Sequence, residues 1–205
     1  MARIEPIAAI RYDFARIGAE LSSRIAPPYD VLDQAEKDAL LARSDRNIVA
    51  VDLPYVPPKS AGPPDVYRKA ALTLHAWLAD GTLVREKQPA IYAYHQTFTV
   101  DGRTYTRRKI IARVQLVPFS EGVVLPHEQT FGGPKEDRLA LMKTTRCNLS
   151  PVFGLYSDPK DEAGKTLAGS VNRPPDATAT LDGVENRVWI ITDTAVIDCV
   201  RSVMA

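Results

Sequence analysis

Polar and charged side chains gather between apolar segments in one stretch of the chain, Leu125–Tyr156. It reads L-P-H-E-Q-T-F-G-G-P-K-E-D-R-L-A-L-M-K-T-T-R-C-N-L-S-P-V-F-G-L-Y. An imidazole, carboxylates, cations, an amide and a hydroxyl within so short a span suit the binding of an anionic group. The candidate site residues of this stretch are His127, Glu128, Lys135, Asp137, Arg138, Asn148 and Ser150.

The step G-G-P-K at 132–135 comes at the start of an expected helix. Proline is favoured at the first helical position, and the free N–H groups and dipole of a helix start attract anions. Lys135 and Arg138 are three residues apart, so both can reach one phosphate or carboxylate. The step is not a Walker A loop. The alternative is a surface helix whose dipole is satisfied by Glu136 and Asp137, with Lys135 in solvent.

His127 and Glu128 form the second candidate group, since a histidine beside a carboxylate can act as acid, base or metal ligand. A zinc protease needs H-E-x-x-H, and position 131 is Phe131. With three histidines in the chain and no clustered cysteines, we expect no His/Cys metal site. A magnesium ion held by carboxylates and a phosphate stays open. The alternative for His127 is a loop histidine bonded to backbone.

Asn148 and Ser150 link the expected helix to the next segment, where they can equally cap the helix end and form a turn. No G-x-S-x-G pattern surrounds Ser150, so it is not expected to be a hydrolase nucleophile. A second odd segment is P-P-Y-D at 27–30, in which two prolines fix the backbone and display Tyr29 and Asp30. Asp30 can be a general base or can bond local backbone. Arg11 follows the first expected strand, where ligand contacts gather in α/β sheets.

Composition limits the function classes. The 205 residues are 45% hydrophobic and 25% charged, as in ordinary globular proteins, and suffice for one large domain or two small ones. The formal charge of +1 argues against a dedicated nucleic-acid binder. Two cysteines without metal spacing fit a reducing cytoplasm, and no apolar run is long enough to span a membrane.

Hydrophobic periodicity predicts an α+β (mixed α/β) fold: a mixed sheet with a β-hairpin at 90–117 and about four to five helices packed on it. We expect one compact unit over 1–205, with 1–86 and 87–205 as the alternative subdivision. The expected strands outside the hairpin are Ile4–Ile10, Asn47–Leu53, Val152–Tyr156 and Val188–Ile191. The expected helices begin at Asp33, Asp65, Pro134 and Asp193, with a short one near Glu162. His75, near the apolar stripe of the second helix, is expected to be structural or exposed.

Asp101-Gly102 predicts the turn of the hairpin. A type I′ turn places Phe98 opposite Tyr105 and Tyr94 opposite Lys109, which makes one face aromatic and basic together with Arg107. Such a face can stack bases and neutralise phosphates. The alternative, favoured by the small net charge, is rings on a core with basic stems along the edges.

The last expected helix carries Val196, Val200 and Val203 on one stripe and ends without a capping residue. This ending has two interpretations: the chain is shortened, or the helix docks on another surface.

Three ordered motifs, R-I-A-P-P-Y-D-V, N-I-V-A-V-D-L-P and the stretch that begins V-L-P-H-E-Q-T-F, resemble the bacterial and archaeal family catalogued as domain of unknown function 1015. The resemblance runs from about residue 2 to the end. Longer members continue after a W-x-I-T-D segment with a D-G-H-H-R motif, which resembles the phosphate-binding signature of ParB and sulfiredoxin. This sequence ends before that motif, so the resemblance implies an N-terminal half.

The resemblance implies ATP-linked phosphotransfer to a small metabolite, with free serine as one acceptor and with ATP and magnesium as the implied cofactors. On that basis Lys135 and Arg138 bind phosphate, Asp30 or Glu128 accepts a hydroxyl proton, and Asp137 holds magnesium or orients Arg138. The chain alone is expected to be inactive and to work with a C-terminal half or as a homo-oligomer. The alternatives are a non-catalytic anion- or protein-binding module and a nucleic-acid-binding domain.

Overall fold

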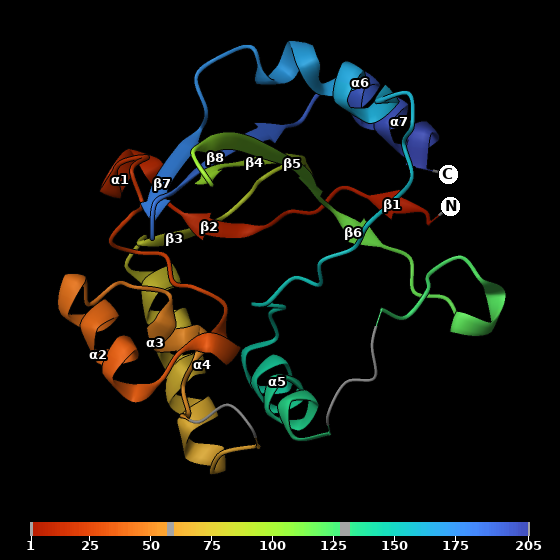
Figure 1. Ribbon diagram of the computed structural model, residues 1–205. Helices are drawn as coiled ribbons and strands as arrows, with labels where there is room; N and C mark the ends of the chain where they lie inside the picture. Colours follow the sequence, from red (N-terminus) through yellow and green to blue (C-terminus); the bar gives the residue numbers. More distant parts are fainter. Residues whose placement is uncertain (1, 57–59, 128–131, 205) are drawn as a thin grey trace. The chain divides into compact units, whose positions relative to one another are not determined.

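The chain divides into two units, each assembled from segments that are far apart in the sequence (Figure 1). The computed structural model describes residues 2–56, 60–127 and 132–204. Unit 1 consists of Met1–Glu20, Val84–His127 and Gly154–Ala205, and unit 2 consists of Leu21–Leu83 and Glu128–Phe153. Seven α-helices and eight strands occur in the described residues, so the α+β class is confirmed.

A four-stranded sheet is the centre of unit 1, in the order β5-β4-β8-β7. Its strands are β4 (Ile91–Val100), β5 (Arg103–Ile111), β7 (Ala177–Leu181) and β8 (Val184–Ile191). Short turns join β4 to β5 and β7 to β8, so neighbouring strands run antiparallel throughout, whereas we expected a mixed sheet. Both turns have positive φ at two successive residues, Asp101-Gly102 and Asp182-Gly183, as type I′ turns require. The predicted register of the first hairpin is confirmed, with Phe98 opposite Tyr105.

Two helices, α6 (Glu162–Val171) and α7 (Thr194–Met204), cover one face of this sheet (Figure 1). The residues of this core are Ile4, Ile91, Ala93, Leu167, Trp189, Ile191, Ile197 and Val200. Asp193 caps α7 by accepting a hydrogen bond from the backbone N of Ala195 at 2.9 Å. Val200 is fully buried and Val196 packs against the same core, so the apolar stripe of α7 faces its own unit.

Short elements complete unit 1. The strand β1 (Ile4–Glu5) pairs with β6 (Arg113–Val114), and β2 (Ile10–Tyr12) pairs with β3 (Leu83–Arg85). The helix α1 (Phe14–Ile17) is one turn long, and a 3-10 turn spans Phe119–Glu121.

Unit 2 is helical. It contains α2 (Gln34–Arg43), α3 (Val49–Asp52), α4 (Pro64–Ala79), α5 (Gly132–Thr145) and a 3-10 turn at Tyr29–Val31. Asp33 and Glu36 form the predicted capping box of α2. The predicted apolar face of α4 is buried: Tyr67, Ala70, Ala71, Leu74 and Trp77. His75 is exposed, as expected.

The strand expected over Asn47–Leu53 is wrong, because α3 occupies Val49–Asp52. The buried side chain of Asn47 explains the change. Its Oδ1 accepts from the backbone N of Val49 at 3.0 Å, and its Nδ2 donates to the carbonyls of Ser23 and Ile25. This side chain satisfies the first turn of a helix and fixes it to a neighbouring loop, which the alternation of apolar residues does not reveal.

Other elements also differ from the expectation. The strand expected over Ile4–Ile10 is not continuous, because β1 covers only Ile4–Glu5 and β2 begins at Ile10. The segment at 152–156 is not a strand, and its side chains are open, with Val152 94% exposed. The strand β7 lies in a region expected to be irregular, and α5 begins at Gly132 rather than at Pro134. In the part of the chain that the structure describes, no helix combines the length and apolar character that crossing a membrane requires.

Candidate functional site

Arg138 on α5 is the centre of a polar cluster inside unit 2. Arg138 contacts Tyr29 of the 3-10 turn, Asp52 at the end of α3 and Ser150 after α5. Tyr67 of α4 joins the cluster through Asp137. A guanidinium has five N–H donors in a rigid plane, so it can join several acceptors at once.

The guanidinium is held on two edges and on one face. Its Nε and Nη2 donate to Oδ2 of Asp137 at 2.9 and 2.6 Å. Its Nη1 donates to the backbone O of Asp52 at 2.7 Å and to Oδ1 of the same residue at 3.0 Å. The ring of Tyr29 lies beneath it, with the guanidinium carbon 3.8 Å from the ring centroid. These contacts fix Arg138 in one orientation, so most of its donors are already used.

Asp137 is the buried carboxylate of the cluster. Its side chain is fully buried, and its Oδ1 accepts a 2.6 Å hydrogen bond from the hydroxyl of Tyr67. That hydroxyl in turn accepts from the backbone N of Gly62 at 2.7 Å. Burial and the hydrogen bond to Asp137 raise the pKa of Tyr67 to about 12, so Tyr67 stays a donor. A buried carboxylate is tolerated when it is paired and hydrogen-bonded in this way.

Asp52 and Ser150 form a second edge of the cluster. The Oγ of Ser150 donates to Oδ1 of Asp52 at 2.9 Å and lies 3.4 Å from Nη1 of Arg138. The side chain of Asp52 is 16% exposed, and its Oδ2 accepts no hydrogen bond from any residue that the structure describes. The carboxylate therefore has one oxygen fixed by two donors and one oxygen left to accept a proton or a hydrogen bond from a ligand.

The remaining unit 2 candidates lie around this edge or on the surface. Tyr29 is half-buried; burial raises the pKa of its hydroxyl, and Arg138 partly offsets the rise. Asp30 is exposed beside it. Lys135 on the first turn of α5 and Asn148 after its end are both exposed. Their side chains are thus not part of the hydrogen-bonded cluster.

Charge and geometry limit what the cluster can hold. Two carboxylates flank one guanidinium, so the cluster carries a net negative charge. No group of three or more metal-ligating side chains occurs among the residues described. Both oxygens of Asp137 already accept hydrogen bonds, from Tyr67 and from Arg138, so this carboxylate is fully engaged within the cluster. The arrangement suits the hydroxyl or ammonium end of a small molecule better than a bare phosphate.

The structure brings four sequence candidates together: Tyr29, Asp137, Arg138 and Ser150. Arg11 belongs to unit 1, where it forms an ion pair with Glu86 and stacks over Phe14 at 4.3 Å. His127 also belongs to unit 1 and is exposed. Glu128 lies outside the described residues.

Two members of the cluster were missed. Asp52 lies in the N-I-V-A-V-D-L-P motif, but the expected strand gave it no role. The signal was a carboxylate directly after a buried apolar run. Tyr67 was assigned to the apolar face of α4, where its ring does lie, but a buried tyrosine hydroxyl needs a partner, and that need pointed to a buried acid.

Comparison with known proteins gives one match. Residues 4–205 match the family described as "Protein of unknown function (DUF1015)". No curated protein and no solved structure matches the chain.

Proposed function

This chain belongs to the DUF1015 family, and we propose that its unit 2 binds the acceptor of a nucleotide-dependent small-molecule kinase. The acceptor is an amino acid with a hydroxyl group, with serine as the candidate that the sequence resemblance suggests. The chain supplies the acceptor-binding part, and a C-terminal nucleotide-binding part completes the enzyme. The two thiols, Cys147 and Cys199, fit a reducing compartment, and the cytoplasm is the proposed location.

The observation that carries this proposal is the carboxylate of Asp52. Its Oδ1 accepts from Ser150 and Arg138, and its Oδ2 accepts no hydrogen bond from the residues that the structure describes. Phosphoryl transfer needs a positioned nucleophile and a group that accepts its proton, and an aspartate takes this role in protein kinases. A carboxylate fixed on one side by two donors meets the need for positioning, because it is already oriented before the acceptor binds and loses little conformational entropy at that step.

The proposed step is a single displacement. The hydroxyl oxygen of the acceptor forms a bond to the γ-phosphorus of the nucleoside triphosphate while the bond from that phosphorus to the bridging oxygen breaks. The acceptor proton passes to Oδ2 of Asp52, and the nucleoside diphosphate leaves. Magnesium, where it takes part, is brought by the phosphates of the nucleotide, as is usual for this ion.

Other residues have supporting roles in this proposal. Arg138 positions Asp52, rather than binding phosphate itself, because its donors already contact Asp52 and Asp137. Lys135 is exposed and remains the phosphate-binding candidate of α5. Tyr29 forms a wall beside Arg138. Asp30 is the alternative base, and the variants Asp52→Asn and Asp30→Asn distinguish the two.

Reconstitution tests the proposal. The chain is mixed with the C-terminal half of a longer family member, ATP and serine, and phosphoserine is followed by phosphorus NMR. Asp52→Asn is expected to lower the transfer rate by about 10²–10⁴-fold, the usual range for a lost acid–base group. Ser150→Ala should cost about tenfold, the equivalent of one hydrogen bond. Asp30→Asn is the matched control and should retain activity. Equal losses in the two aspartate variants, or no transfer to any hydroxyl amino acid, contradict the proposal.

A non-catalytic protein-binding module is the second candidate, favoured by exposed apolar side chains in the segment after β6. Leu116 is 95% exposed, Leu125 is 73% exposed and Phe119 is 61% exposed. Light scattering with and without the C-terminal half measures this role. Two results together favour the binding module over the kinase. The chain associates with the C-terminal half and Leu116→Ser abolishes that association, and the mixture transfers no phosphate.

A further inference from the structure

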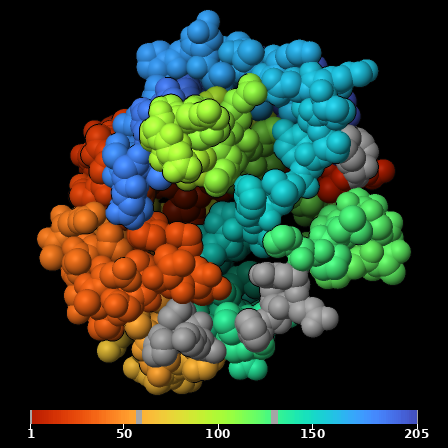
Figure 2. All heavy atoms as spheres, in the orientation of Figure 1, coloured from red at the N-terminus to blue at the C-terminus, as the bar shows by residue number. Residues whose placement is uncertain are grey.

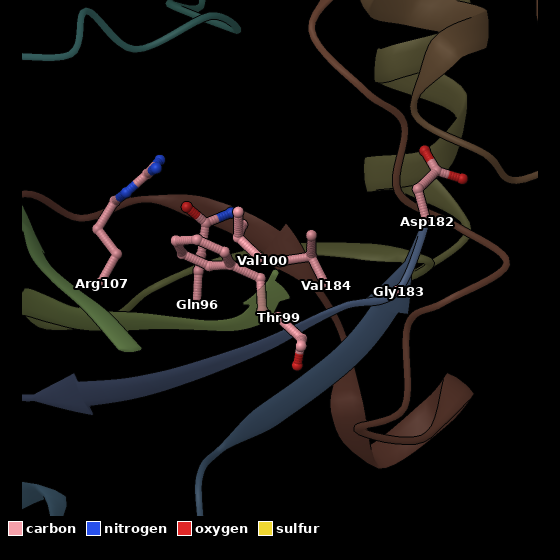
Figure 3. A pocket seen from close by; sticks show the side chains of 8 residues that line it. Gln96, Thr99, Val100, Arg107, Asp182, Gly183 and Val184 are labelled. Atoms are coloured by element: carbon pink, nitrogen blue, oxygen red, sulfur yellow. The ribbon is translucent and has the colours of Figure 1, made fainter. Parts of the chain in front are cut away.

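A hollow of about 530 Å³ lies on the sheet of unit 1, at the turn ends of β4 and β8 (Figure 3). Its lining includes Gln96, Phe98, Val100, Arg107, Asp182 and Val184. Residues alternate between faces along a strand, and Ile91 and Ala93 of β4 face α6 and α7. Gln96 and Phe98 therefore lie on the opposite face. The tip of the β4–β5 hairpin, yellow-green in Figure 2, is open on the side shown there.

Positive charge is concentrated on this face of the sheet. Arg103, Arg107 and Lys109 are alternate residues of β5 and share the face with Phe98. Among the described residues, Arg107 has no hydrogen bond and no ion pair, and its guanidinium carbon lies 5.3 Å over the ring of Phe98. Burial and the nearby Arg107 lower the pKa of Lys109, as expected of cations that repel one another. An anion bound at Arg107 would relieve this repulsion.

Apolar side chains lie in the middle of the hollow and beside it. Phe98 and Tyr105 lie opposite each other on β4 and β5, with ring centroids 6.0 Å apart and planes inclined by 28°. Val100 and Val184 extend this surface toward the second turn. Aromatic and β-branched side chains side by side are a suitable surface for a flat ring.

The far end of the hollow is acidic. Asp182 begins the β7–β8 turn with φ of 49°, and in Figure 3 its carboxylate stands across the hollow from Arg107. No described residue forms a hydrogen bond or an ion pair with this carboxylate. The hollow therefore has a cation at one end, an apolar middle and a hydrogen-bond acceptor at the other end.

We propose that this hollow binds a free nucleotide whose base carries an exocyclic amino group. The phosphate binds Arg107, the base lies on Phe98 and Val184, and the amino group donates to Asp182. The volume is within the range of about 300–1,000 Å³ that is usual for small-molecule sites. A nucleic-acid strand is disfavoured, because the whole chain has a formal charge of only +1 and thus no excess of cations for many phosphates. The site lies in unit 1 and does not depend on the function proposed for unit 2.

Titration of the full chain with adenosine monophosphate, followed by amide NMR and calorimetry, tests this site. Shifts should concentrate in β4, β5 and the turn at Asp182. Arg107→Gln should weaken binding about tenfold or more, as loss of a charged hydrogen bond does. Arg103→Gln is the matched control: it removes the same charge from the same sheet face, outside the hollow, and should change the affinity less than about twofold.

Two ligand comparisons test the ends of the hollow. Adenosine, without phosphate, should bind about tenfold or more weakly than its monophosphate. Inosine monophosphate, which lacks the amino group, should also bind more weakly, and Asp182→Asn should remove most of that preference. Equal effects of the two arginine variants, no binding up to about 10 mM, or tighter binding of an adenine oligonucleotide with a steep salt dependence each overturn the assignment.

Discussion

Arg138 lies over the ring of Tyr29, with its guanidinium carbon 3.8 Å from the ring centroid. The stack closes the face of a guanidinium whose edges are bonded to Asp137 and Asp52. A side chain that carries a charge is thereby made part of the interior of unit 2. Removal of the Arg138 side chain should therefore lower the stability of the fold, whatever its effect on a reaction.

Arg138→Ala is expected to reduce the free energy of unfolding by about 3–5 kcal/mol, because it leaves the buried charge of Asp137 without its cation. Arg138→Lys should restore little of this loss, since an ammonium cannot bridge both carboxylates or stack as a plane. Urea denaturation measures both variants. Lys135→Ala, on the exposed side of the same helix, is the control and should change stability by less than about 0.5 kcal/mol. Similar stability of Arg138→Ala and Lys135→Ala would show that the cluster does not hold the unit together.

Tyr67→Phe removes the hydroxyl that donates to Asp137 and is expected to cost about 1–3 kcal/mol, because a buried oxygen loses its donor. The pKa of Tyr67 is raised from 10.0 to about 12, so the folded state keeps a proton that the unfolded state loses. The associated stability is complete below pH 10 and is lost as the pH rises toward 12. Ultraviolet titration of tyrosinate should find a tyrosine with a pKa of about 12 that Tyr67→Phe removes, while the other tyrosines still titrate. A variant that titrates like the parent would refute the assignment.

Asp176 in unit 1 connects the loop before β7 to β8. It accepts two bonds from Arg173, at 2.9 and 2.7 Å, and one from the backbone N of Ile190 at 2.7 Å. Burial acts to raise the pKa of Asp176, but these bonds outweigh it and the pKa is lowered from 3.8. Its stabilisation is therefore present above pH 3.8 and lost as the pH falls through the lower folded value. Asp176→Asn should destabilise the protein at neutral pH by about 1–3 kcal/mol and should flatten the acid limb of the stability curve. An unchanged acid limb would contradict this role.

His95 lies between two arginines in the sheet, opposite Arg108 on β5 and Arg187 on β8, with its ring 4.9 Å from that of Trp189. Burial and then these two cations lower its pKa from 6.5. The neutral form is favoured in the fold, so this contribution is lost as the pH falls below 6.5 and through the folded value. Arg108→Gln should raise the pKa of His95 in an NMR titration. Arg103→Gln, on the same strand but the other face, should not; equal shifts would point to general surface charge instead.

Several elements could be predicted because their signals are local. The Asp33 capping box, the apolar stripe of α4 and the Asp101-Gly102 turn each depend on residues a few positions apart, and all three were predicted. The α3 helix could not be predicted, since its start depends on Asn47 binding carbonyls more than twenty residues earlier in the sequence.

The candidate site shows the same division. Tyr29, Asp137, Arg138 and Ser150 were identified by residue type and by motif. Asp52, the partner of Arg138 and Ser150, was not, because only the tertiary packing of α3 against α4 and of α4 against α5 places position 52 next to position 138. Sequence reasoning also treated Arg138 as free to bind phosphate, whereas burial pairs it with two carboxylates.

The most direct test of the account asks whether Oδ2 of Asp52 receives a hydroxyl. The full chain is titrated with serine and with alanine, which differ by that one group, and the amide resonances of unit 2 are followed by NMR. Serine should shift Asp52, Ser150 and their neighbours at lower concentration than alanine does, and Asp52→Asn should abolish the difference. Identical titrations with the two amino acids, or serine shifts that persist unchanged in Asp52→Asn, would contradict the account.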